Sequence, residues 1–298
     1  MNKSSHLKPI LQAILVTFLW STSFILIKKG LLEIPAITYA GLRYGLAWLF
    51  FLPFILFTKH RSEITKLSRI QWKKLILLGL IFYTFTQGAQ FLGLYYLPSV
   101  TVSLMLNFTP ILVAVLGIFL LNEKPSILQW MGAALFLIGI FTYFFPVVLV
   151  GNRALGLAIM IFGVLANAGS AIIGRDVNRS KNIHPIIITF VSMGIGAVIL
   201  LVVGLITNGL PTISGRNWIY LFWLAGINTA FAFTLWNHTL RSLTAMESSI
   251  INGTMLIQIA ILAWVFLGET ITLQESTGMI LAAMGAVLVQ IKKKNLDL

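Results

Sequence analysis

Ten long apolar runs occupy nearly the whole chain, and they constrain its fold more than any other feature. They lie near residues 9–28, 37–57, 72–94, 99–121, 126–149, 154–174, 184–207, 217–240, 245–267 and 273–291. A helix that crosses a bilayer needs roughly 20 mostly apolar residues, and each run is about that long. Because the connections are too short for a soluble domain, the sequence predicts an all-α integral membrane protein with ten transmembrane helices.

Composition excludes several other classes of protein. The chain is 58% hydrophobic and only 10% charged, whereas an ordinary soluble domain has roughly a quarter of its residues charged. A soluble enzyme and a disordered chain are therefore excluded. The sequence contains no cysteine, which excludes disulfides, iron–sulfur clusters and thiolate nucleophiles.

Most basic residues lie in the loops and tails outside the predicted spans. The net charge of +13 would suggest a nucleic-acid partner in a soluble protein, but cytoplasmic loops of membrane proteins also collect Lys and Arg. With the N-terminus inside, 16 basic residues fall on the inner side, Arg43 lies within a span, and four fall outside: Lys28, Lys29, Arg153 and Arg216. We therefore expect a multi-pass protein of the cell (inner or plasma) membrane, with both termini cytoplasmic, a lipid partner and no nucleic acid.

The second half of the sequence repeats the first. Residues Trp72 to Gly139 match Trp218 to Gly285 at a constant offset of 146 residues, without a gap. The matched identical pairs include Leu94 with Leu240, Ser103 with Ser249, Glu123 with Glu269 and Gly132 with Gly278. We interpret residues 1–150 and 151–298 as two copies of a five-helix unit.

A repeat of five spans has a consequence for topology. Since five is odd, the second copy must enter the membrane in the opposite orientation to the first. Inverted repeats of this kind are typical of secondary transporters, in which exchange of two packings opens the site to alternate sides. Glu123 and Glu269, equivalent in the repeat, should then lie on opposite membrane faces.

Short motifs in both halves resemble those of the EamA branch of the drug/metabolite transporter superfamily, over nearly the whole chain. They are Phe18-Leu19-Trp20-Ser21 with Lys28, Arg43, Gly93-Leu94-Tyr95-Tyr96, Asn107-Phe108-Thr109-Pro110, Asn122-Glu123-Lys124, Gln129-Trp130-Met131-Gly132, Leu235-Trp236-Asn237 and Gly268-Glu269. The resemblance implies ten helices in two inverted repeats around a central cavity, and export, or sometimes import, of small metabolites. Two departures are Leu256, which stands where the first half has Pro110, and Ser276, which stands opposite Trp130. We therefore expect the ninth span to bend differently from the fourth.

Arg43 is the only formal charge well inside a span. An intramembrane ionisable residue suggests function, but an arginine can also extend its side chain to the membrane surface or bind carbonyl groups. A structural role and a role in gating or substrate binding both remain open for Arg43.

No Asp or Glu lies at mid-membrane, although proton relays through membranes usually use carboxylates or histidines. A facilitated carrier, or coupling through a span-end residue such as Glu123, fits this pattern better than proton exchange at a buried carboxylate.

Glu123 and Glu269 end the fourth and ninth spans. Because a carboxylate is unfavourable at a helix C-terminus, another group must hold each one, either as an interfacial anchor or as a gate contact.

The other polar residues in the spans are neutral, and in lipid they must face protein or water. Helix–helix hydrogen bonding and ligand contact are equally open for any one of them. As a set, with aromatic residues that could instead be core or interfacial, they outline an amphipathic cavity. The candidates for substrate binding are Asn107, Asn252, Trp20, Tyr44, Gln87, Gln90, Phe91, Asn167, Trp236 and Asn237.

Asn107 is the strongest single candidate. Pro110 in the fourth span should kink the helix and free the carbonyl of Leu106, and the adjacent Asn107 amide can both donate and accept. Asn252 and Gly253 occupy the corresponding region of the second half. The sequence thus predicts two polar notches that face the cavity, with substrate passing between them.

The favoured function is a secondary transporter that moves small amphipathic metabolites, such as amino acids or related compounds, by alternating access, as an exporter or a facilitated carrier. Membrane-embedded enzymes and non-transporting scaffolds are the alternatives. The chain contains no HExxH, GxSxG, GxGxxG or P-loop motif, so we expect neither catalysis, a metal nor a cofactor. The oligomeric state stays open, and a monomer is compatible with the sequence.

Overall fold

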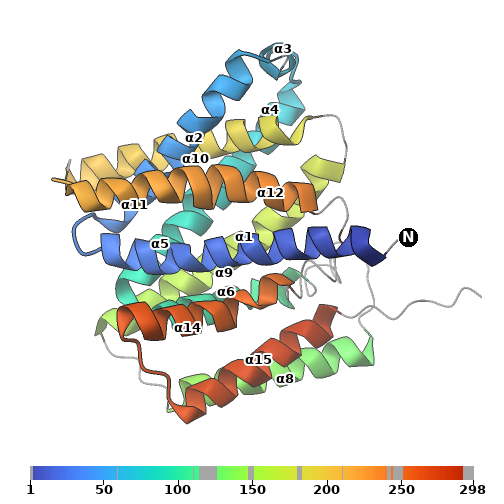
Figure 1. Cartoon of the computed structure of the whole chain (residues 1–298), viewed down its shortest axis with the longest axis vertical. Coiled ribbons are helices and arrows are strands. Elements are labelled where there is room, and N and C mark those ends of the chain that lie inside the picture. The colour runs from blue at the N-terminus through green and yellow to red at the C-terminus, as the bar shows by residue number, and fades with distance from the viewer. Residues whose placement is uncertain are drawn as a thin grey trace, which may run out of the picture. The chain divides into compact units, whose positions relative to one another are not determined.

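A computed structural model describes residues 3–58, 60–109, 111–113, 126–146, 151–179, 183–209, 211–239, 243 and 251–290, apart from the side chains of residues 3–6, 175, 178, 179, 237, 289 and 290. Within these residues every regular element is a helix (Figure 1). The long ones are α1 (Lys3–Gly30), α2 (Ala36–Leu56), α8 (Ile127–Phe144), α9 (Gly151–Arg179), α10 (Pro185–Asn208) and α15 (Leu273–Gln290).

The third and eighth predicted spans are each built from three consecutive helical segments. The third consists of α4 (Arg69–Leu78), a π-helical segment η1 (Gly79–Thr86) and α5 (Gln87–Tyr96). The eighth consists of α11 (Gly215–Ala225), a second π-helical segment η2 (Gly226–Phe231) and α12 (Ala232–Thr239). At the 146-residue offset the two π-helical segments coincide. π-helical turns are rare and concentrate at functional sites. Their recurrence at equivalent positions therefore makes these segments of the third and eighth predicted spans candidates for a functional role.

Among the residues that the structure describes, seven helices are long and apolar enough to cross a membrane. Three shorter apolar helices, Ser99–Val113, Ile251–Leu267 and Leu273–Leu288, fall on the fourth, ninth and tenth predicted spans. The fourth span begins with α6 (Ser99–Leu106), and the ninth contains α14 (Met255–Leu267). The chain is therefore a multi-pass membrane protein.

The fourth and ninth spans are interrupted at equivalent positions. The amides of Asn107 and Phe108 bond to carbonyls three residues back, and the Thr254 amide does the same with Ile251. Thr254 is the repeat equivalent of Phe108. The ninth span thus breaks without a proline, because the Thr254 hydroxyl also donates to the Ile251 carbonyl, at 2.6 Å, and so competes with the regular helical bond.

Helix starts also recur at the same offset. Ser68 and Gln71 form a capping box at the start of α4, and Ser214 accepts a hydrogen bond from the Asn217 amide at the start of α11. Ser126 and Gln129 form a capping box at α8, and Thr272 and Glu275 exchange the same two bonds at α15. Both halves therefore begin their third and fifth predicted spans with a side-chain cap at equivalent residues.

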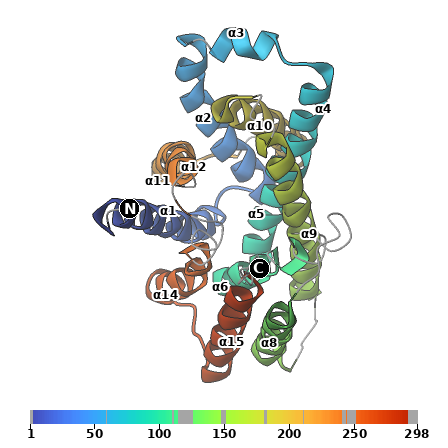
Figure 2. The same cartoon turned by 90° about the vertical axis from the view of Figure 1, so that its right-hand side faces the viewer.

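The described chain divides into two compact units, each of which takes helices from both halves. The first contains Met1–Ile25, Pro98–Ala154 and Leu235–Leu298, and the second contains Leu26–Leu97 and Leu155–Thr234. In the second unit, the six-residue α3 (His60–Thr65) joins α2 to α4 (Figure 2). The core of that unit includes Leu75 and Leu78 of α4 together with Ile187 and Val191 of α10.

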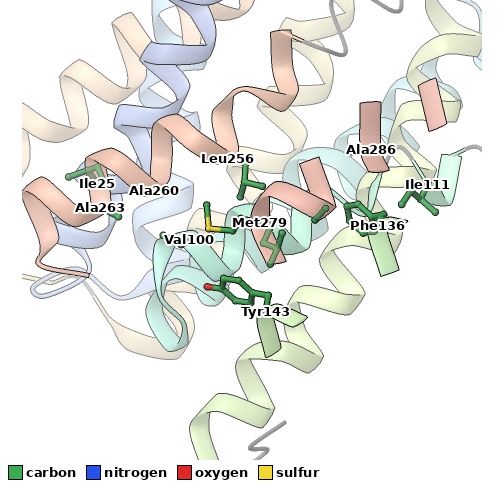
Figure 3. Close-up of a cluster of buried hydrophobic side chains, with 12 residues drawn as sticks. Ile25, Val100, Ile111, Phe136, Tyr143, Leu256, Ala260, Ala263, Met279 and Ala286 are labelled. Carbon is green, nitrogen blue, oxygen red and sulfur yellow. The ribbon is translucent and has the colours of Figure 1, made fainter. Parts of the chain in front are cut away.

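The core of the first unit joins α6, α8, α14 and α15. Figure 3 shows Val100 of α6, Phe136 of α8, Leu256 of α14 and Met279 of α15 in one cluster of buried side chains. Each of these side chains is at most 7% exposed. The cluster fixes the fourth, fifth, ninth and tenth spans against one another.

Within each unit, helices that are equivalent in the repeat pack against each other. Figures 1 and 2 both show α8 beside α15. A Cβ atom added at Gly139 would lie 2.6 Å from the Gly278 carbonyl oxygen, and one added at Gly285 would lie 2.6 Å from the Gly132 carbonyl oxygen. Since the start of α8 meets the end of α15, the two equivalent helices run antiparallel.

The pair α2 and α10 in the second unit has the same arrangement. A Cβ atom at Gly41 would lie 2.6 Å from the Leu201 backbone nitrogen, and one at Gly204 would lie 2.7 Å from the Thr38 backbone nitrogen. The start of α2 therefore meets the end of α10, again antiparallel. Glycine allows the two backbones to approach this closely, as is common for helix pairs in membranes.

Candidate functional site

Arg43 is enclosed by protein within the second unit. It lies on α2 and is 4% exposed, so its side chain does not extend to a surface. Its Nε donates to the hydroxyl of Thr229 at 3.0 Å, and its guanidinium carbon lies 5.4 Å from the ring centre of Tyr44. The buried charge of Arg43 therefore connects α2 to the π-helical segment η2.

Thr229 makes two hydrogen bonds that explain its place in η2. Besides accepting from Arg43, its hydroxyl donates to the Leu224 carbonyl five residues back, at 2.8 Å. A bond to the fifth residue back matches the register of a π-helix rather than an α-helix. In η1, Thr86 makes the same bond with the Ile81 carbonyl at 2.9 Å.

Tyr44 and Gln87 form a buried polar pair beside Arg43. The Tyr44 hydroxyl donates to the Gln87 Oε1 at 2.6 Å, which joins α2 to the start of α5. The Tyr44 ring also packs edge-on against Tyr83 of η1, with centroids 5.6 Å apart. The structure thus brings Arg43, Tyr44 and Gln87 together as one buried polar group.

Phe91 lies among the buried side chains of the same unit. It is fully buried and packs edge-on against Tyr39 at a centroid distance of 5.4 Å. Gln90 on α5 and Asn167 on α9 are half-buried in the same unit. The Asn167 backbone carbonyl accepts a hydrogen bond from Ser170.

The first unit holds a second polar and aromatic group. The rings of Trp20 on α1 and Trp236 on α12 lie 5.2 Å apart. Directly after Trp20 in the chain, the buried Ser21 hydroxyl bonds to the Gln258 Oε1 at 2.9 Å. The Gln258 amide donates in turn to the hydroxyls of Thr254, at 3.0 Å, and Thr17. This network ties α1 to α14 at the point where the ninth span breaks.

Asn107 and the Asn252-Gly253 pair lie at the two helix interruptions. The Asn107 amide nitrogen donates to the Ser103 carbonyl at 2.9 Å, and the side chain is half-buried. Asn252 is exposed, and a Cβ atom added at Gly253 would have no atom within 4 Å. Pro110 and Glu123 lie outside the described residues, as does the side chain of Asn237.

Glu269 is held by the start of another helix. Its Oε1 accepts from the Ser99 amide at 2.9 Å and its Oε2 accepts from the Val100 amide at 3.3 Å. The carboxylate therefore lies at the positive end of α6, which compensates for its position after the C-terminus of α14. The sequence indicates that some group must stabilise this carboxylate, and the structure shows that the first amides of α6 do so.

Other charged side chains bind helix ends in the second unit. Lys28 donates to the carbonyls of Leu94 and Leu97 at the end of α5. Glu33 accepts from the Ser214 amide at the start of α11. Hydrogen bonds from the side chains of Ser214 and Asn217 hold the pKa of Glu33 below its ordinary value. Favourable helix-end charges of this kind fix the connections between spans.

Sequence reasoning missed Thr229 and Thr17. A threonine inside a span usually bonds to its own helix, so the sequence carries no signal that these hydroxyls meet Arg43 and Gln258. From the sequence, Gln258 could be recognised only as one of many neutral polar residues in the spans. Among the residues that the structure describes, no group of three His, Asp or Glu could hold a metal ion.

Comparisons with known proteins agree with this architecture. The model of the EamA-like transporter family matches residues 7–145 and again 154–291. The chain is 26% identical to "Uncharacterized transporter YoaV" of Bacillus subtilis (strain 168), over 93% of this chain and 95% of that protein. It is 25% identical to an "Uncharacterized transporter" of Archaeoglobus fulgidus, over 96% of this chain and 99% of the relative.

A solved structure supports the fold. It matches with a TM-score of 0.64 and 17% sequence identity, covering 97% of this chain and 98% of its own. Since the family model covers both halves of the sequence, the chain belongs to the EamA-like transporter family.

Proposed function

We propose that this protein is a secondary transporter that moves small amphipathic metabolites across the cell membrane by alternating access. Its ten spans form two inverted five-helix repeats, residues 1–150 and 151–298, around a central cavity. Both termini are cytoplasmic, and the protein acts as an exporter or a facilitated carrier and not as an enzyme. The family and the names of the relatives support transport.

The antiparallel packing of repeat-equivalent helices carries the proposal. In an inverted repeat, each helix of one half runs opposite to its equivalent in the other half. The crossings of α8 with α15 and of α2 with α10 have this direction, and the matched caps and π-helical segments add two further correspondences. Such repeats can exchange two inequivalent packings, which is the physical basis of alternating access.

The polar groups support a site for neutral or zwitterionic solutes. The first unit carries amides, hydroxyls and indoles near the helix interruptions. The second unit, taken by itself, carries Arg43 as a buried cation beside Tyr44 and Gln87. Polar groups on aromatic walls are typical of small-molecule sites. Because the spans hold no mid-membrane carboxylate, we propose that flux needs no proton gradient.

The test is flux in proteoliposomes with a panel of candidate solutes, including amino acids. Counterflow of at least one solute without a proton gradient is the expected result. Obligatory, stoichiometric proton movement would contradict the proposed mechanism and direct attention to Glu123, Glu269 or His238. The absence of flux for every class of solute would favour a non-transporting scaffold or an enzyme.

Asn107 provides a variant for the same assay. We expect Asn107→Leu to lower flux at least ~10-fold, which corresponds to about 1.4 kcal/mol or one lost hydrogen bond. Asn208→Leu is the matched control, because the Asn208 amide also donates to a carbonyl four residues back, that of Gly204, but lies at the end of α10. Equal flux in wild type and Asn107→Leu would remove Asn107 from the substrate path.

A further inference from the structure

The start of α6 lacks a cap of its own. Its N-cap residue is Pro98, which offers no side-chain acceptor, and no side-chain cap bond is present. The first amides of a helix have no intrahelical partner, and at the edge of a membrane an unpaired amide is costly. The two oxygens of Glu269 supply acceptors for the Ser99 and Val100 amides. The cap of α6 therefore comes from a different span.

The chain reverses sharply to bring Glu269 to this place. Helix α14 ends at Leu267, and Gly268 has φ 67° and ψ 20°, in the left-handed region. The amides of Gly268 and Glu269 both bond to the Ala263 carbonyl, and a glycine in the left-handed region is a common way for a helix to end. Asn122, the repeat equivalent of Gly268, is the residue type that tolerates this conformation next best.

The contact joins the far ends of two half-spans. Helix α6 ends at Leu106, at the break in the fourth span, and α14 starts at Met255, at the break in the ninth. Along their lengths they are held by apolar contacts of the cluster that includes Val100, Leu104 and Ala260. Such contacts are non-directional, so the carboxylate supplies the directional bond at the end away from the breaks.

We propose that Glu269 is a latch between the fourth and ninth spans, and that this inference rests on the proposed transport cycle. With the latch formed, the Ser99 end of α6 is fastened to the end of α14. Opening that end for solute passage breaks the two carboxylate–amide bonds, and the helix interruptions at Asn107 and Thr254 let the half-spans move. Glu269 is a positioning residue and needs no contact with the solute.

The experiment uses the cysteine-free chain in nanodiscs, where both faces are accessible and neither solute nor gradient is present. Ser99→Cys is the probe, because Ser99 is fully buried and its hydroxyl has no hydrogen-bond partner within the described part of the chain. We expect slow reaction with a hydrophilic maleimide, and at least about 10-fold faster reaction when Glu269→Gln is added, since one of the two bonds is lost and the other is no longer charge-assisted. Glu275→Gln, which removes the carboxylate of a local cap at α15, should leave the rate unchanged.

A second variant separates a latch from a simple cap. Pro98→Ser supplies a local N-cap for α6 without joining it to α14. Added to Glu269→Gln, it should restore the thermal unfolding temperature while the cysteine of the Ser99→Cys probe stays fast to react. Slow labelling in the Glu269→Gln variant, or protection regained with Pro98→Ser, would overturn the latch. Because no flux is measured, failure of the proposed transport function would be seen separately in the proteoliposome assay.

Discussion

Replacing Gly139 by leucine should separate α8 from α15 and lower the free energy of unfolding by at least about 2 kcal/mol. Even a Cβ atom at this position would meet the Gly278 carbonyl oxygen at 2.6 Å, and a backbone atom cannot rotate away as a side-chain end can. The helices must therefore move apart and lose contacts of the cluster around Phe136 and Met279. Chemical or thermal unfolding in detergent would measure the loss.

The crossing of α8 and α15 is nearly symmetric, so the same substitution can be tested on both helices. A Cβ atom at Gly278 would lie 2.7 Å from the Gly139 carbonyl oxygen, so Gly278→Leu should be similarly destabilising. Gly215→Ala is the control, because a Cβ atom there would have no atom within 4 Å. Wild-type stability in both leucine variants would show that α8 and α15 do not pack as described.

The second large effect is expected at Thr229. Thr229→Val keeps the shape of the side chain but removes the hydroxyl that accepts from Arg43 Nε and donates to the Leu224 carbonyl. A buried donor left without this acceptor costs about 1–3 kcal/mol, and more when it is charged. We expect a loss of stability of about 2 kcal/mol and flux reduced at least ~10-fold.

Thr86→Val and Arg43→Met isolate the arginine contact. Thr86→Val removes a hydroxyl that bonds to the fifth residue back in η1, so it should be milder than Thr229→Val. In an Arg43→Met background the charge is gone, and Thr229→Val should then lose most of its effect. Thr229→Ser, which keeps the hydroxyl, should behave like wild type. An equal cost of Thr229→Val with and without Arg43 would show that the two residues are not coupled.

The parts of the fold that follow local rules could be predicted from the sequence. Apolar runs of about 20 residues indicate the spans, and the constant offset that pairs Gly132 with Gly278 indicates the repeat. The same offset pairs Ser68 with Ser214, and the structure has both serines as helix N-caps. Local chemistry decides these features, because a cap bonds only to amides two or three residues away.

The candidate site was less predictable because its contacts join distant parts of the chain. Arg43 meets Thr229 across 186 residues, and Ser21 meets Gln258 across 237. No periodicity marks such partners, and a π-helical segment has the same apolar composition as the α-helix around it. Phe91 is fully buried against Tyr39, and the sequence left both a core and a cavity position open for it, since core and cavity aromatics look alike in sequence.

The helix break in the ninth span shows a further limit. Pro110 gave a reason for a break in the fourth span, and its absence at Leu256 predicted a different bend. The structure interrupts the ninth span at Thr254, two residues before Leu256, through a hydroxyl that bonds to the Ile251 carbonyl. A threonine in a span can adopt this bond or leave the helix regular, so its sequence position alone does not decide between the two.

The inverted topology is tested most directly by labelling two equivalent residues of the repeat. Lys66 and Thr212 are both exposed, and each lies two residues before its N-cap serine, Ser68 or Ser214. Introduced singly into the cysteine-free chain, Lys66→Cys and Thr212→Cys would be treated in intact cells with a membrane-impermeant maleimide. We predict that only Thr212→Cys reacts from outside and that Lys66→Cys reacts only after the membrane is opened. Labelling of both from the same side would contradict the inverted repeat.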